Sequence, residues 1–352
     1  MNTGIFKNIS VSLTLIVATQ SLAVGLRLPN QDPEAIARGN AFVATADNPS
    51  AIYHNPAGIT QLEGQQLSIG AYLISTDVSF ESPVGVTGNT DSTIQAVPQI
   101  HYVLSPENSD FSYGFGVYVP YGLSIDYGDS SPFPTLAEEG SLTYLTLNPV
   151  LAYQVNDSLS LGIGMTINLS EVELSSQIGL LPGDEFSYEG DAVAYGFNLG
   201  LLWDISSRVS FGANYRSETS FDYEGSSLSS SSPFVSDYVA TDFSATFPQY
   251  VDFGIAYRPN DIWTFEANID WTDWEVLDSP VFEGTGFGDV PFNFNYDSSL
   301  MYEFGVTKRL SSGLLLSGGY IYSENSAPDL NFTPLNPDSN LHLGSIGIAK
   351  RG

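Results

Sequence analysis

The 352-residue sequence contains no cysteine, only 10 lysines and arginines, and no long apolar run after its first thirty residues. The lack of cysteine is compatible with an exported protein but does not establish one. A membrane protein built of helices would show runs of roughly 18 or more apolar residues, so that class is excluded. The net charge of −30 argues against nucleic acid as a partner, because binding to phosphates needs Lys and Arg. It also argues against docking on anionic lipid headgroups.

The N-terminus has the layout of a secretory signal. Lys7 precedes an apolar segment at residues 11–17, and small residues stand at Ser21 and Ala23. The apolar segment is too short to span a bilayer, so an uncleaved anchor is the less favoured interpretation. We therefore expect residues 1–23 to be a signal peptide, and the mature protein to be periplasmic, secreted or in the outer membrane.

From about residue 64 onward, apolar residues recur at every second position, which is typical of strands with one apolar face. In residues 159–169 the odd positions are Leu, Ile and Met, and the even positions are Ser, Gly, Thr and Asn. Twelve such segments can be counted, near 64–82, 93–105, 110–127, 140–155, 158–175, 190–204, 207–224, 241–258, 261–278, 291–309, 312–326 and 339–350. Short and long connections alternate between them, as in an outer-membrane barrel with tight periplasmic turns and long external loops.

Aromatic residues gather toward the ends of these segments, where a barrel places its interfacial girdles. The candidates are Tyr121, Tyr127, Tyr153, Trp203, Trp271 and Trp274. Ordinary β-propensity of Tyr and Trp is the alternative explanation.

The third segment, FSYGFGVYVPYGLSIDY at 111–127, carries a break at its centre. Pro120 cannot donate to a sheet ladder, and Gly122 removes a side chain and tolerates unusual backbone angles. We expect the break to span Val119, Pro120, Tyr121 and Gly122. It faces a protein-lined cavity at membrane depth, or it lies above the membrane where water satisfies the backbone.

Residues 24–63 lack the period of two and are too short to form a domain. Asp32 can cap a short helix that has Pro33 at its first position. We expect this region to be a plug inside an antiparallel transmembrane β-barrel formed by residues 64–352.

Residues 46–58, ADNPSAIYHNPAG, resemble the N-terminal plug of the FadL/TodX family of outer-membrane transporters for hydrophobic compounds. Further resemblances follow in order: PYGL at 120–123, LNPVLAYQVNDSLSLGIG at 147–164, YRSE at 215–218, WTDW at 271–274 and Pro337-Asp338. The ordered set runs from about Arg38 to the end of the chain.

The resemblance implies a monomeric all-β barrel of fourteen strands in the outer membrane of a Gram-negative bacterium. It implies passive movement of long-chain fatty acids or hydrocarbons, without a cofactor, past a hatch and sideways through the kinked third strand into the bilayer. Insertion machinery is an implied partner. The hatch residues would be Arg38, Gly39, Asp47, Asn55, Pro56, Ala57 and Gly58.

Twelve segments are visible, and the sequence ends on Gly352 rather than on the aromatic residue usual in such barrels. We therefore expect the last two strands to be missing. A complete twelve-stranded barrel is the alternative, because an even number of strands can close.

A site for a fatty acid needs an apolar tunnel and a cation near one end for the carboxylate. The candidates are Ile36, Phe42 and Ile52 for the lining and Arg38 and Arg216 for the cation. The apolar residues equally suit anchoring of the hatch, and pairing with an acid such as Glu218 is the favoured role for Arg216.

Enzymatic and metal sites find little support. His54, His101 and His342 are accompanied by no GxSxG motif and no ligand spacing, so we expect neither catalysis nor a metal. Asp184, Glu185 and Glu189 suit a solvated acidic loop better than a weak calcium site. The alternative functions are a water-filled porin for polar solutes and, ranked last, an adhesin or enzyme with its specificity in the external loops.

Overall fold

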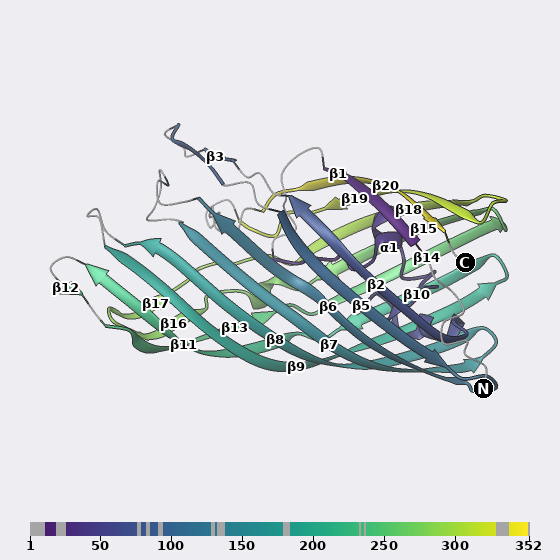
Figure 1. Ribbon diagram of the computed structural model, residues 1–352, viewed down its shortest axis with the longest axis horizontal. Coiled ribbons are helices and arrows are strands. Elements are labelled where there is room, and N and C mark those ends of the chain that lie inside the picture. Colours follow the sequence, from purple (N-terminus) through teal and green to yellow (C-terminus); the bar gives the residue numbers. More distant parts are fainter. Residues whose placement is uncertain are drawn as a thin grey trace.

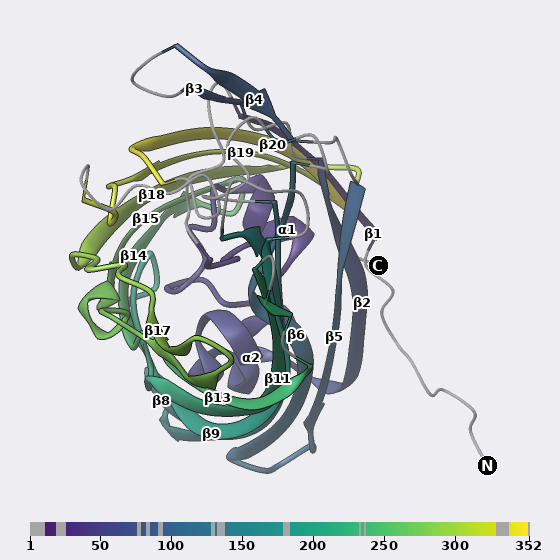
Figure 2. The ribbon, with the colours of Figure 1, turned by 90° about the vertical axis from the view of Figure 1, so that its left-hand side faces the viewer.

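The computed structural model describes residues 11–18, 26–75, 79–81, 85–90, 94–127, 131, 138–178, 184–231, 234–235, 237–328 and 338–350. In these residues the chain forms an antiparallel β-barrel, seen from the side in Figure 1 and nearly along its axis in Figure 2. No helix among them is long and apolar enough to cross a membrane.

The wall strands follow one another along the sequence. They are β2 (Gly64–Ser75), β5 (Ile94–Ser105), β6 (Phe111–Asp126), β7 (Glu139–Asn156), β8 (Leu159–Gln177), β9 (Glu185–Ser206), β10 (Val209–Arg216), β11 (Thr219–Ser231), β13 (Val239–Phe247), β14 (Tyr250–Asn260), β15 (Trp263–Thr272), β18 (Ser299–Arg309), β19 (Leu314–Ser323) and β20 (Leu341–Lys350). Shorter strands lie in the connections: β3 (Ser79–Glu81), β4 (Thr87–Asn89), β12 (Phe234–Val235), β16 (Val281–Thr285) and β17 (Gly288–Pro291). Each of the twelve expected segments contains at least one wall strand, which confirms the positions that the sequence predicted for the strands.

The wall has the polarity of a lipid-facing surface. On β8, Ile163 and Met165 are 53% and 50% exposed, whereas Thr166 and Asn168 on the opposite face are 2% and 1% exposed. A soluble sheet would bury the apolar face instead. Apolar side chains outside and polar side chains inside are what a bilayer demands of a barrel.

The prediction of an interfacial girdle is wrong for three of the six residues. Tyr153, Trp203 and Trp271 are exposed on the wall, but Tyr121, Tyr127 and Trp274 are buried, with Trp274 in the short helix η2 (Trp274–Val276).

A β-bulge explains the position of Tyr121 and Tyr127. Tyr118 of β6 lies opposite Thr146 of β7, while Tyr121 lies opposite Tyr144, so β6 carries one extra residue. One extra residue sends all following side chains to the other face of a strand. Tyr121 and Tyr127 therefore do not follow the exposed row that begins at Phe111.

The apolar segment of the expected signal peptide forms β1 (Val11–Ala18), which pairs with β20. Ala23, after which cleavage is expected, lies outside the described residues, so the signal peptide stays a prediction. Among the described strands, β2 pairs with β5 alone, and no ladder joins it to β1 or β20.

Residues 26–63, called the inner segment from here on, lie inside the barrel (Figure 2). They contain α1 (Pro33–Ala37), α2 (Ala51–His54) and η1 (Pro56–Gln61). Asp32 caps α1 as expected, because its Oδ1 accepts hydrogen bonds from the amides of Glu34 and Ala35. Most residues of the inner segment are buried, so the lumen is filled at this level.

Candidate functional site

Polar side chains of the wall hold the backbone of the inner segment. Ser210 of β10 donates to the carbonyl of Ala44 at 2.7 Å, and Glu266 of β15 accepts from its amide at 2.7 Å. Farther round the barrel, Asn198 of β9 donates to the carbonyl of Ile52 at 3.2 Å. The polar inner faces of the strands thus replace the water that these buried backbone groups would otherwise need.

Glycines on the inner wall let the two backbones touch. A Cβ at Gly212 would lie 2.1 Å from the carbonyl oxygen of Val43, and one at Gly319 would lie 2.0 Å from the amide nitrogen of Gly39. The same holds at Gly162, Gly200 and Gly305. Any side chain at these positions would push the inner segment off the wall.

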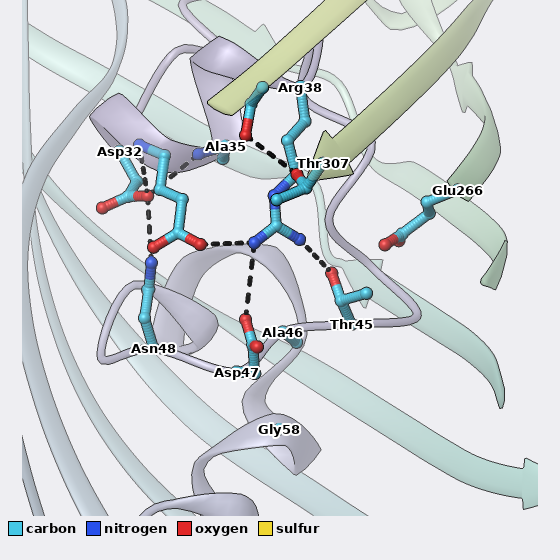
Figure 3. A network of polar contacts seen from close by, with 12 residues as sticks. Asp32, Ala35, Arg38, Thr45, Ala46, Asp47, Asn48, Gly58, Glu266 and Thr307 are labelled. Carbon is cyan, nitrogen blue, oxygen red and sulfur yellow. Dashed lines mark hydrogen bonds and ion pairs between the residues drawn. The ribbon is translucent and has the colours of Figure 1, made fainter. Parts of the chain in front are cut away.

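Arg38, which is buried, and Asp47, which is partly exposed, meet in a polar network (Figure 3). The Arg38 guanidinium donates to Glu34 and, at 3.0 Å, to Thr45, and its Nη2 lies 3.7 Å from Asp47. Burial, together with the nearby negative charge of Glu34, raises the pKa of Asp32 to about 6. This network ties the first helix to the turn that follows it.

Asn55 to Gly58 form the second fixed point of the inner segment. The side-chain Nδ2 of Asn55 donates to the carbonyl of Val43 at 2.8 Å and, across to the wall, to the carbonyl of Leu201 at 2.9 Å. Pro56 begins η1, and Asn55 Oδ1 accepts from the amide of Ala57. A Cβ at Gly58 would lie 2.4 Å from the carbonyl oxygen of Ala46, so this position requires glycine (Figure 3).

The wall is interrupted between β5 and β6. These strands pair from Leu104 opposite Tyr113 to Ile100 opposite Val117, and no described ladder continues beyond that point. From there, residues 118–126 of β6 pair with β7 alone among the wall strands.

Residues 26–31, here called the strap, contact β6 beside this interruption. The Leu28 amide donates to the carbonyl of Pro120 at 2.8 Å, and the Gly122 amide donates to the carbonyl of Leu26 at 2.9 Å. The Gln31 side chain donates to the carbonyl of Val119 at 2.6 Å. The strap therefore satisfies backbone groups that the break in the ladder leaves without a wall partner.

Arg27 fastens the strap to the opposite wall, a role that the sequence did not reveal. Its guanidinium contacts both carboxylate oxygens of Asp270 at 2.8 and 2.6 Å and donates to Thr272. It also lies 3.7 Å from the centre of the Tyr250 ring. Asp252 lies directly opposite Asp270 on the neighbouring strand, so a single guanidinium faces two carboxyl groups.

Arg216 is buried among tyrosines. Its guanidinium lies 5.1 and 5.4 Å from the ring centres of Tyr53 and Tyr118, and its Nε donates to the Tyr250 hydroxyl. In the described part of the chain it makes no ion pair with Glu218, whose side chain is exposed.

The other lining candidates lie within the packing of the inner segment. Phe42 packs edge-on against the His54 ring, and Ile52 fills the space above Gly114 and Gly116 of β6. Ile36 is buried in α1. None of these three residues lines the cavity described next, and neither does Arg216.

An apolar cavity of about 120 Å³ lies beside the strap. Its lining comes from the strap, β7, β8, β11, β13, the residue after η2, β16 and the segment after β17: Leu26, Gly140, Ser141, Leu142, Val172, Glu173, Leu174, Tyr223, Phe243, Ala245, Phe247, Leu277, Phe282, Phe292 and Phe294. Phe243 and Phe282 stack with ring centres 4.3 Å apart. Sequence reasoning missed these residues, although the alternation of aromatic and acidic residues in FDYE at 221–224 indicates an apolar inner face.

The histidines form no catalytic group in the described residues. His54 lies against Tyr53, and burial lowers its pKa to about 3. His101 stacks on Tyr118, and His342 hydrogen-bonds Tyr320 on the outer wall.

The acidic residues that lie together in the structure differ from the three considered in the sequence, Asp184, Glu185 and Glu189. Carboxylate oxygens of Glu171, Glu173 and Glu189 lie within 4.8 Å of one another on the exposed wall, without Asp184 or Glu185. We assign no ion to this group, because exposed acidic side chains commonly gather without one.

A model of the family of outer membrane protein transport proteins (OMPP1/FadL/TodX) matches residues 14–350. The chain belongs to this family. It is therefore a protein of the bacterial outer membrane, in a family of transporters rather than enzymes.

Named relatives agree with this membership. The chain is 26% identical over 254 residues to a long-chain fatty acid transport protein of Escherichia coli O6:H1, covering 62% of this chain and 55% of that one. It therefore spans about half the length of that relative in the alignment. With the protein of the same name from E. coli K12, identity is 22% and the coverage is 94% and 85%.

The fold is shared with two crystal structures. A Pseudomonas aeruginosa FadL homologue superposes with a TM-score of 0.75 at 14% identity, covering 93% of this chain and 98% of that one. The Ralstonia pickettii toluene transporter TbuX gives 0.71 at 20% identity, with 92% and 99% covered.

Proposed function

We propose that this protein carries hydrophobic compounds, fatty acids or hydrocarbons, inward across the outer membrane by passive diffusion. A ligand enters the apolar cavity from outside, passes the strap and leaves sideways between β5 and β6 into the bilayer. The names of two similar proteins, a long-chain fatty acid transport protein and a toluene transporter, support a hydrophobic substrate.

One observation carries this proposal: the cavity, the strap and the interruption of the wall meet at Leu26. Leu26 lines the cavity, and its carbonyl accepts the hydrogen bond from Gly122 in the break of β6. Leu142 also lines the cavity, and its carbonyl oxygen lies 3.6 Å from the position of a Cβ at Gly122. A ligand that displaces the strap thus stands beside the break.

The inner segment would act as the hatch of this route. Its backbone is bonded to several strands of the wall, and its residues fill the lumen below the cavity. A porin for polar solutes needs an open, water-filled passage along the axis. The packed interior therefore favours lateral exit over axial flow.

Chemical stapling of the break tests the route. The Gln95 side chain of β5 donates to the carbonyl of Ser124 in β6 at 3.2 Å, so these positions face each other across the interruption. Because the chain has no native cysteine, Gln95→Cys and Ser124→Cys can be joined selectively by a short bismaleimide. Uptake of labelled p-xylene and of labelled oleate is measured in cells expressing the double variant before and after the reaction, and joining should abolish the protein-dependent uptake of whichever probe is transported.

The controls are the two single-cysteine variants treated with the same reagent, which blocks one thiol without bridging the strands. Both should retain uptake. If the bridged protein transports as fast as the single variants, the ligand does not leave through this break and the proposed route is wrong.

A further inference from the structure

We propose that the apolar cavity selects uncharged ligands about the size of one aromatic ring and rejects organic carboxylates. This inference rests on the proposed function, because it names the substrate class of the same site.

The size of the cavity favours a compact ligand. Its volume is about 120 Å³. An apolar protein cavity of roughly 150 Å³ lined by Leu, Ile and Phe stays dry and binds benzene. Phe243, Phe282 and Phe292 surround the space with ring faces and edges, which suits stacked or edge-on packing with a guest ring.

The lining offers no partner for a negative charge. Among the residues that the structure describes, the lining contains no Lys, Arg or His, and its polar side chains are those of Ser141, Glu173 and Tyr223. The Tyr223 hydroxyl is engaged with Ser170 at 2.8 Å, and Glu173 itself is exposed on the outer wall. An ionised carboxylate buried here would lose its hydration without gaining a counter-charge, which is strongly unfavourable.

The two nearby guanidinium groups are not available to the cavity. Arg27 follows Leu26 directly, but its guanidinium is held by Asp270 and Thr272. Arg216 is enclosed by tyrosine rings and does not line the cavity.

The distribution of charge along the chain reinforces this selection. No Lys or Arg occurs between Arg38 and Arg208, and none occurs in the long connections near 83–92, 128–139, 176–189, 225–240, 279–290 and 327–338. Most of the remaining basic residues lie beside the short turns at the other end of the barrel: Arg208, Arg258, Lys308, Arg309 and Lys350.

Acidic side chains surround the strands that build the cavity. An outer collar of exposed carboxylates comprises Glu171, Glu173, Glu189, Asp191, Asp222, Glu224, Asp242 and Glu283. A surface of one sign lowers the local concentration of ligands of the same sign and slows their arrival. Organic anions are therefore disfavoured before they reach the apolar lining.

A matched pair of ligands tests the selection. p-Xylene and 4-methylbenzoate differ by one methyl group in place of a carboxylate. Initial rates of uptake of the labelled compounds are measured at pH 7.5 in cells expressing the full chain, with the empty-vector rate subtracted and labelled oleate as a third probe. We expect protein-dependent uptake of p-xylene to exceed that of 4-methylbenzoate by about tenfold or more, equivalent to about 1.4 kcal/mol.

A charge introduced into the cavity should shift this ratio. Ala245→Lys places a cation in the lining and should narrow the ratio at least severalfold. Thr246→Lys adds the same charge at the next residue, which does not line the cavity, and should leave the ratio unchanged.

The outcomes separate the two proposals. Equal or faster uptake of 4-methylbenzoate overturns the charge selection. Uptake of oleate without p-xylene overturns the substrate class and leaves the transport function standing. If none of the three probes enters faster than in empty-vector cells, although the barrel is present in the membrane, the proposed function itself fails.

Discussion

Replacing Arg27 by methionine should detach the strap from the break in β6. Arg27 and Asp270 form a buried pair with both side chains at most 4% exposed. Removing one partner of such a pair costs about 3–5 kcal/mol, because the other charge stays buried without compensation. Asp252 directly opposite adds a second carboxyl group to the uncompensated site.

This loss should raise the population of the detached strap by about two to three and a half orders of magnitude, since about 1.4 kcal/mol is tenfold in an equilibrium. The Gly122 amide reports the change, because it donates to the carbonyl of Leu26 in the strap. Its hydrogen–deuterium exchange, followed by mass spectrometry of peptides covering residues 119–126, should accelerate by a similar factor. The double variant Arg27→Met, Asp270→Asn should recover part of the protection, because it removes the Asp270 charge and leaves Asp252 as the one carboxyl group of this pair.

Arg258→Met is the matched control. Arg258 lies at the end of β14 and donates to Ser210, away from the strap, so its loss should not change exchange at Gly122. Unchanged protection of Gly122 in Arg27→Met would show that the ion pair does not hold the strap, and the reasoning would be wrong.

Three further variants probe other parts of the structure. Gly58→Val should displace the turn at Ala46, because the close approach leaves no room for a Cβ, and limited proteolysis of the inner segment should then increase. Burial and the charge of Glu34 raise the folded pKa of Asp32 to about 6, above its ordinary value of 3.8, so the inner segment loses stability as pH rises through this window. Asp32→Asn keeps the cap and should remove this loss of roughly 2–3 kcal/mol, so amide exchange in α1 should respond less to pH between 4 and 7. Phe282→Ala should widen the cavity and lower p-xylene uptake severalfold at normal barrel yield, and an undiminished rate would exclude this ring from the ligand site.

The strands were predictable from the sequence because each wall residue faces either lipid or the lumen. Because of this constraint, apolar and polar residues alternate in segments such as 159–169, and the strands can be predicted from this alternation without knowledge of tertiary contacts. The cap at Asp32 was equally local, since it depends on the amides of the next three residues.

The face of the strand on which a residue lies was less predictable where the strand is irregular. A single extra residue in β6 turns Tyr121 and Tyr127 away from lipid, and the sequence does not mark where the ladder on β7 slips. The same limit explains Trp274, which lies in a short helix rather than at the end of a strand.

By itself, the sequence determined the class of the protein: alternating strands, short and long connections and an N-terminal segment without that alternation. The tertiary structure alone decided where the break in the third strand finds its hydrogen bonds, because the strap is about ninety residues away along the chain. It also placed Arg27 against Asp270, 243 residues apart, and assembled the aromatic cavity from several strands. Closing a barrel brings such distant residues together through pairing between strands, and no local pattern in the sequence records which of them will meet.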